Sequence, residues 1–115
     1  MNELREYVER IRDEIKSLYD MTDEEREQRE EVGETSDLFE YFADALDMEY
    51  TISGTGDYLG VRVYVTLGGP NVWVDTRRGE VGGAWGTDRE SVWLPSEICD
   101  EIDSIFCEAY ESLRA

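Results

Sequence analysis

Apolar and polar residues alternate most regularly in the middle of the chain, from Leu59 to Thr76. The apolar positions of its first half fall on every second residue, as in a half-buried β-strand. These positions are Val61, Val63, Val65 and Leu67. A second strand follows, with Val72 and Val74 on one face and Trp73 on the other. The glycine–glycine–proline sequence at 68–70 separates the two, so the pattern predicts a β-hairpin on which the remaining elements pack.

A helical period replaces this alternation at both ends of the chain. In the segment 1–19 the apolar residues fall within a stripe about 120° wide. They are Leu4, Tyr7, Val8, Ile11, Ile15, Leu18 and Tyr19. The segment 96–113 is predicted to be a second long amphipathic helix, with Ser96 as its N-cap and Cys99 near the rim of the buried face. Its expected buried residues are Ile98, Ile102, Ile105, Phe106, Ala109, Tyr110 and Leu113.

A shorter helix is predicted over 36–47, with Thr35, Ser36 and Asp37 as cap candidates. We expect its buried face to hold Leu38, Tyr41, Phe42, Ala45 and Leu46, with Phe39 at the edge. The segment 20–34 between the first two helices is different, because it holds eight acidic residues and only two apolar ones, Met21 and Val32. Thr22 and Glu25 stand at capping-box spacing, so this acidic exposed segment can hold a short helix.

Further strands complete a sheet over 48–94. Met48 to Ser53 alternates, whereas Val81 to Trp85 is interrupted by two glycines, which mark a bulge or a close approach of another backbone. Ser91 to Leu94 is either a short edge strand or extended chain. The expected fold is α+β: one domain, with an antiparallel sheet of three to five strands, two or three N-terminal helices and one C-terminal helix. The helices cover one face, and the other shows Tyr64 and Trp73, with Trp85 as a further candidate.

Charge changes the picture more than any motif does. The 115 residues include 29 acidic and 11 basic ones, for a formal net charge of −18, although 40% are hydrophobic and can form a core. Such a surface repels phosphate backbones, so we expect no direct binding of nucleic acid.

No apolar run is long enough to span a membrane, and the start of the chain lacks the pattern of a secretory signal, so we expect a cytoplasmic protein. Cys99 and Cys107 lie about 12 Å apart along one helix, too far for a disulfide.

The sequence contains none of the common catalytic motifs that we considered. There is no histidine, the cysteines lack CxxC spacing, and neither a GK[ST] phosphate loop nor a D-x-D-x-D-G calcium loop is present. Cys99 and Cys107 stand among acids, which disfavour a reactive thiolate. With 29 acids a carboxylate pair can be drawn anywhere, and a solvated surface is the simpler reading. We therefore expect no enzyme, no cofactor and no metal.

The sequence suggests two explanations for the acidity. One is adaptation to high salt, because the chain has one lysine, Lys16, against ten arginines. Glutamate outnumbers aspartate and the apolar content is ordinary, however, and a GC-rich genome also lowers lysine. The other is imitation of nucleic acid, because Glu97, Glu101 and Glu108 share a helix face at about 6 Å per i, i+4 step, comparable to phosphate spacing. Such a face would dock on a basic nucleic-acid-binding surface of another protein.

The candidate partner-binding residues follow from this hypothesis. They are Asp23, Glu24, Glu25, Glu27, Glu30 and Glu31 of the acidic segment, Glu97, Asp100, Glu101, Glu108 and Glu111 of the last helix, and Trp73 of the sheet. The tryptophans are either ordinary packing residues of the fold or anchors of a protein interface. An alternative function is therefore a structural or regulatory interaction module that uses the aromatic face of the sheet.

The chain also resembles a group of known proteins. The segments DLFEYFADALDMEYTI, GVRVYVTLGGPNVWVDT and WLPSEICDEIDSIF, within Asp37 to Leu113, together with size, acidity and layout, are similar to the small anti-defence proteins of phages and mobile elements. These are the anti-CRISPR and antirestriction proteins. The resemblance implies an inhibitor in the host cytosol that binds a CRISPR effector such as Cas9 or Cascade, or another nuclease, and blocks its DNA-binding surface. It assigns no role to any individual residue.

Overall fold

The computed structural model describes residues 3–114. Its elements in chain order are α1 (Glu3–Asp20), α2 (Asp23–Glu31), α3 (Leu38–Ala43), β1 (Asp47–Ile52), β2 (Tyr58–Thr66), β3 (Asn71–Asp75), β4 (Glu80–Trp85), β5 (Asp88–Trp93) and α4 (Ser96–Arg114). The fold is α+β, with one open five-stranded antiparallel sheet, three helices before it and one after it. This confirms the predicted class.

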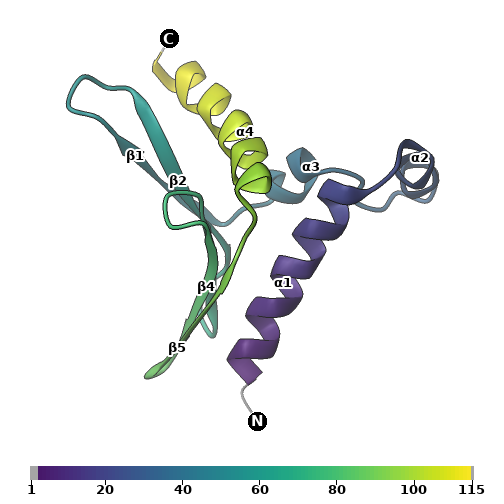
Figure 1. The fold of residues 1–115 in the computed structure, drawn as a ribbon, viewed down its shortest axis with the longest axis horizontal. Coiled ribbons are helices and arrows are strands. Elements are labelled where there is room, and N and C mark those ends of the chain that lie inside the picture. Colours follow the sequence, from purple (N-terminus) through teal and green to yellow (C-terminus); the bar gives the residue numbers. More distant parts are fainter. Residues whose placement is uncertain (1–2, 115) are drawn as a thin grey trace.

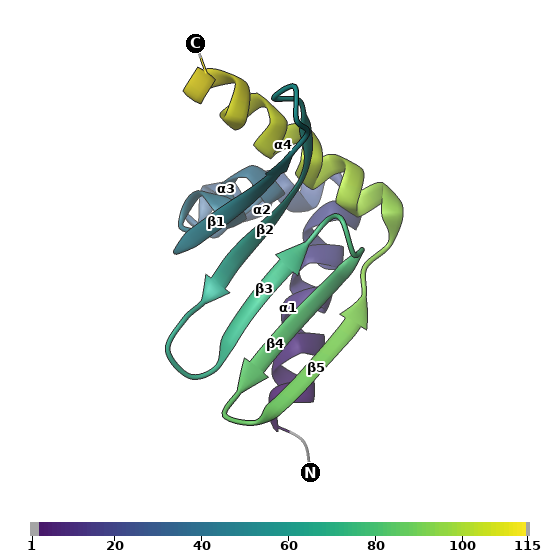
Figure 2. The ribbon, with the colours of Figure 1, turned by 90° about the vertical axis from the view of Figure 1, so that its left-hand side faces the viewer.

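The sheet is a meander, in which the strands lie in the order β1-β2-β3-β4-β5 and each pairs antiparallel with its neighbours. All four helices lie to one side of it (Figure 1). Figure 2 shows the opposite face of the sheet, which no helix covers. Helix α1 packs on β4 and β5, and α4 packs on β2, so the core lies between these two long helices and the inner face of the sheet.

The close approach of α1 to the sheet depends on Gly83 of β4. A Cβ atom at this position would lie 2.8 Å from Cγ2 of Val8 and 2.9 Å from Cδ1 of Leu4. On the other face of the same strand, a Cβ at Gly82 would lie 2.6 Å from Nε1 of Trp73. The two glycines that interrupt the strand pattern are therefore places where side chains of α1 and β3 contact the backbone of β4.

The predicted helix over 36–47 is too long, because α3 ends at Ala43. Asp37 is its N-cap and accepts a hydrogen bond from the backbone N–H of Glu40 at 2.8 Å. Three residues later the chain has joined the sheet, where the Leu46 N–H donates to the carbonyl oxygen of Tyr64 at 3.0 Å. Leu46, expected in the core, is consequently 59% exposed.

The predicted last helix is correct in extent but not in every burial. Ser96 is its first helical residue and not its cap, and the carbonyl of Pro95 accepts the first backbone bonds. Ala109 and Leu113, expected in the core, are exposed. The C-terminal half of α4 contacts the turn between β1 and β2 through Tyr110 and Arg114 instead, which both donate to the carbonyl of Gly56. Cys99 is fully within the core and not at its rim.

Three strand predictions also need correction. The last strand is complete, running from Asp88 to Trp93 as an edge strand. β2 ends at Thr66 after a register shift, so Leu67 lies in the turn and is 48% exposed. Trp85 alternates with Val81 and Gly83 and therefore belongs to the helix-bearing face, not to the open one.

Candidate functional site

The acidic segment contains a helix with all six of its candidate residues exposed. Thr22 accepts a hydrogen bond from the Glu25 N–H at 3.2 Å, and the Glu25 carboxylate accepts one from the Thr22 N–H at 3.4 Å. This capping box starts α2, although the helix buries no residue of its own. Asp23, Glu24, Glu25, Glu27, Glu30 and Glu31 all face solvent.

Backbone anchors hold α2 to the body of the protein. Met21 is buried just before the helix, and Arg26 donates to the carbonyls of Ser36 at 2.8 Å and Leu18 at 3.1 Å. Arg29 donates to the carbonyl of Thr35 at 3.2 Å. Because both arginines bind carbonyl oxygens, no ion pair is formed by the α2 carboxylates within residues 3–114.

The five candidate acids of α4 form a second exposed surface. At 100° per residue they fall within an arc of about 100°, and they extend over about 21 Å of the helix axis. They are Glu97, Asp100, Glu101, Glu108 and Glu111, all exposed. In the described part of the chain only Glu111 of these five forms an ion pair, with Arg114 at 4.0 Å. DNA carries one phosphate per about 3.4 Å of each strand, so α4 presents a similar but sparser line of charge.

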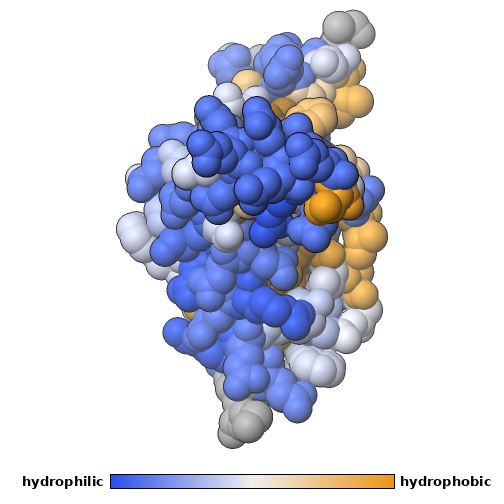
Figure 3. Space-filling view, turned by 90° about the vertical axis from the view of Figure 1, so that its right-hand side faces the viewer, coloured by the Kyte–Doolittle hydropathy of each residue, from blue (hydrophilic) through white to orange (hydrophobic). Residues whose placement is uncertain are grey.

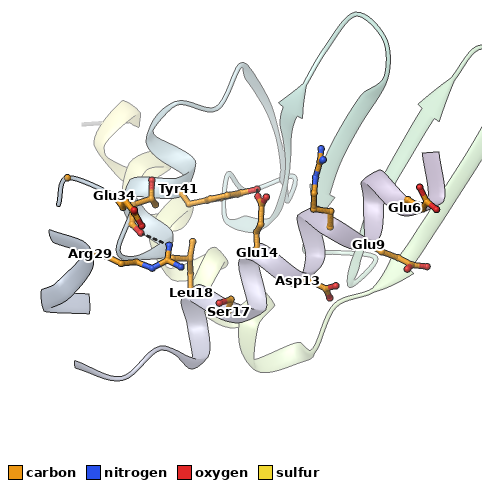
Figure 4. A pocket seen from close by; sticks show the side chains of 12 residues that line it. Glu6, Glu9, Asp13, Glu14, Ser17, Leu18, Arg29, Glu34 and Tyr41 are labelled. Atoms are coloured by element: carbon orange, nitrogen blue, oxygen red, sulfur yellow. Dashed lines mark hydrogen bonds between the residues drawn. The ribbon is translucent and has the colours of Figure 1, made fainter. Parts of the chain in front are cut away.

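A third acidic surface lies in a groove of about 900 Å³ between α1 and the segment that leads from α2 to α3. Its carboxylates are Glu6, Glu9, Asp13, Glu14 and Glu34. Figure 4 shows Tyr41 reaching across the groove toward Glu14, to which its hydroxyl donates at 3.2 Å. Burial, and then the Glu14 charge, raise the pKa of Tyr41, so the phenol stays protonated and keeps this bond.

Sequence reasoning did not single out the acids of α1. The signal was present, because Glu6, Glu9 and Asp13 stand at i, i+3 and i+7 and so share one helix face. By its pattern this face is the ordinary solvent side of an amphipathic helix, and only the return of the chain through Glu34 makes it one wall of a groove. Figure 3 shows that hydrophilic side chains cover most of the helical side of the molecule, with apolar groups along one margin.

The open face of the sheet carries the remaining candidate, Trp73. Its ring lies under the Arg62 guanidinium, 4.8 Å from the centroid, and meets Tyr64 edge-on at 6.2 Å. Its indole Nε1 is buried and has no hydrogen-bond partner among the described residues. Arg62 is held in place by Asp75 at 3.0 Å, whose other oxygen accepts two backbone N–H bonds. Trp73 is thus largely a packing residue of this face.

Trp93 is the most exposed aromatic residue of the open face. It pairs with Glu80 at the edge of the sheet, and 72% of its surface is exposed. The sequence pattern could have identified Trp93 as exposed, because it alternates with the apolar residues Val92 and Leu94, which are buried. An interaction through the open face would therefore use Trp93 before Trp73.

Burial and nearby acids make the Cys99 thiol a poor nucleophile. Burial, together with the charges of Asp103 and Asp100, raises the pKa of Cys99 to about 11, which opposes formation of a nucleophilic thiolate. Within residues 3–114 no cluster of three or more potential ligands is placed to hold a metal ion. None of the helices described is long and apolar enough to cross a membrane.

Neither family models, curated proteins nor solved structures gave a match to this chain. The interpretation of the site therefore depends on its geometry and charge.

Proposed function

We propose that this protein is a non-enzymatic inhibitor that occupies a basic nucleic-acid-binding surface of another protein. The observation that carries the proposal is the arrangement of the candidate acids of α2 and α4, which are exposed and, within the described residues, almost free of ion pairs although ten arginines are present. A charge of −18 attracts a basic partner over long range and repels nucleic acid itself. The specific form of the proposal, by resemblance, is an anti-defence protein directed at a CRISPR effector or another nuclease in the cytosol.

Rigid presentation supports a binding role. The α2 acids are set by a capping box and by two arginine anchors, and the α4 acids stand on a helix whose other face is in the core. Preorganised charges lose little conformational entropy on binding. An acidic disordered tail would provide the same net charge without this geometry.

The test begins with capture of the partner from cells on the immobilised protein, at low and at high salt. We expect a nucleic-acid-binding protein that elutes as salt increases and whose DNA binding the free protein inhibits. In that competition assay, Glu97→Arg, Glu101→Arg and Glu108→Arg together should weaken inhibition about tenfold or more. A second variant carries the same reversal at Asp23, Glu27 and Glu30.

The matched control reverses three exposed acids elsewhere, Glu3, Asp47 and Asp88, which changes the net charge equally. Inhibition that survives both sets of reversals would exclude mimicry by α2 and α4. An equal loss in the control would show that net charge alone acts, without a defined surface.

A second candidate function is an interaction module that uses the open face of the sheet. The 72% exposure of Trp93 is the observation that favours it, since tryptophan is common among interface hot spots. Trp93→Ala should then weaken capture of the partner, and added salt should have little effect. Capture that is sensitive to salt but not to Trp93→Ala would reject this alternative.

A further inference from the structure

An apolar groove runs between α3 and α4 on the helical side. Phe39 and Ala43 of α3, with Ile105 and Ala109 of α4, line a cavity of about 310 Å³. A second cavity of about 190 Å³ shares Phe39 and Ile105 with it and is more polar, because Asp37 and Glu101 also line it. From Glu101 to Ser112 of α4 the two cavities extend over about 16 Å, which is three turns of a helix.

Phe39 is exposed at this groove although the core beneath it is already filled. Its neighbours Leu38 and Phe42 are each only 4% exposed, and Phe42 packs edge-on against Phe106 at 5.7 Å. Phe39 itself is 68% exposed, and Leu113, one turn beyond Ala109 on α4, is 75% exposed. Large exposed apolar side chains beside a groove are typical of an interaction site.

The rims of this groove are acidic. Glu101 and Glu108 line the cavities on the α4 side, and Asp37 lines them at the start of α3. Glu40 and Asp44, which follow Phe39 and Ala43 in the chain, are exposed outside the cavities. Among the described residues that line the two cavities, Arg26 is the one cation, and its guanidinium is occupied by two backbone carbonyls. An occupant therefore meets an apolar floor between two negative edges.

We infer that this groove binds an amphipathic helix from a basic partner protein. Apolar residues at i, i+3 or i+4, and i+7 of that helix fill the two cavities, and its lysines and arginines face the acidic rims. A second copy of this chain does not fit, because its own rims and its charge of −18 repel the same features here. The inference rests on the proposed function, to which it adds an apolar anchor beside the acids of α4.

The probe is a synthetic peptide of leucine and lysine, about 18 residues long, with leucines at helical i, i+3, i+4, i+7 spacing. A scrambled peptide of the same composition, with leucines on every side of the helix, is the control. Fluorescence anisotropy of labelled peptide with the intact protein should show binding of the amphipathic peptide about tenfold tighter than of the scrambled one.

Two substitutions in the groove test the location. Phe39→Ser removes the exposed anchor contact, and Ala109→Gln fills the groove without adding charge; each should weaken peptide binding about tenfold or more. Both positions are exposed, so folding should not change. Trp93→Ser is the matched control, because it removes an equally exposed aromatic residue from the opposite face, and it should leave peptide affinity unchanged.

Equal affinity for the two peptides, or unchanged affinity in Phe39→Ser, would overturn the inference. So would a dimer in sedimentation equilibrium that Phe39→Ser dissociates, because the occupant would then be a second copy. The reversal at Asp23, Glu27 and Glu30 separates the two proposals in the partner assay, because none of these residues lines the groove. If it abolishes inhibition and Phe39→Ser does not, charge mimicry by α2 stands and the groove fails. The opposite result leaves the groove and rejects mimicry by α2.

Discussion

Gly82 and Gly83 show how single residues connect the two faces of this fold. Gly83 lets α1 approach β4, and Gly82 lets the Trp73 indole lie flat on the same strand. The sequence marked both positions as an interruption of a strand. The sequence could not show which side chains would come close to these glycines. Val8, which contacts Gly83, is 75 residues away in the chain, and Trp73, which contacts Gly82, is 9 residues away.

Gly83→Ala should therefore destabilise the protein. The new Cβ would lie within 3 Å of Val8 and Leu4, both buried, so the free energy of unfolding should fall by about 1–3 kcal/mol. Urea denaturation followed by circular dichroism measures this change. Gly54→Ala is the control, because nothing lies within 4 Å of that position, and equal stability of the two variants would contradict the packing argument.

Cys99 gives a second prediction for a single side chain, in a Cys107→Ser variant that leaves it as the only thiol. Burial raises the pKa of Cys99 from its ordinary value of 9.0 to about 11, so the thiolate at pH 8 is about a hundredfold scarcer than for an ordinary thiol. Reaction with a thiol reagent should therefore be slow at pH 8 and accelerate toward pH 11, then become fast in urea. Fast reaction of the folded protein at pH 8 would contradict this.

Helix α2 depends on its caps and anchors more than any other element. It buries none of its own side chains, so the capping box at Thr22 and the two carbonyl bonds of Arg26 supply the structure that holds its acids in place. An isolated helix of this length is unstable in water. The acidic surface of α2 is thus rigid only because the chain around it is folded.

Thr22→Ala should loosen α2 without unfolding the protein. Loss of the N-cap costs a helix about 1 kcal/mol, so amide exchange from Glu27 to Glu31 should become about fivefold faster while the global stability changes little. Hydrogen exchange measured by mass spectrometry tests this. Thr87→Ala, in an exposed turn, is the matched control and should not affect exchange in α2.

The charge of −18 affects the molecule as a whole. Like charges on a compact body repel each other, and salt screens that repulsion. The Debye length falls from about 30 Å at 0.01 M salt to about 8 Å at 0.15 M, so most of the relief should come at modest salt.

We expect the midpoint of thermal unfolding to rise by several degrees between 0.01 and 0.2 M sodium chloride and then to level off. Differential scanning calorimetry measures this curve, with sodium sulfate avoided because it also strengthens hydrophobic burial. A protein adapted to high salt would continue to gain stability into the molar range. That result would favour the halophile explanation of the acidity over a binding role.

The sequence by itself determined the long helices and the central strands of this protein, because these depend on a local period. The stripe of α1, the valine alternation of β2 and β3 and the Thr22–Glu25 capping box all appear in the structure as expected. It also identified the acids of α2 and α4 as exposed, since charged side chains without a buried partner must face water.

Only the tertiary structure decided which of these surfaces face each other. The groove against α1 depends on the return of the chain through Glu34, and the apolar groove depends on how the short helix α3 packs beside α4. Phe39, Ala109 and Leu113 belong to apolar helical stripes, yet they are exposed. An apolar stripe predicts that a helix has a buried side. How many residues of the stripe are buried depends on which neighbouring elements cover them.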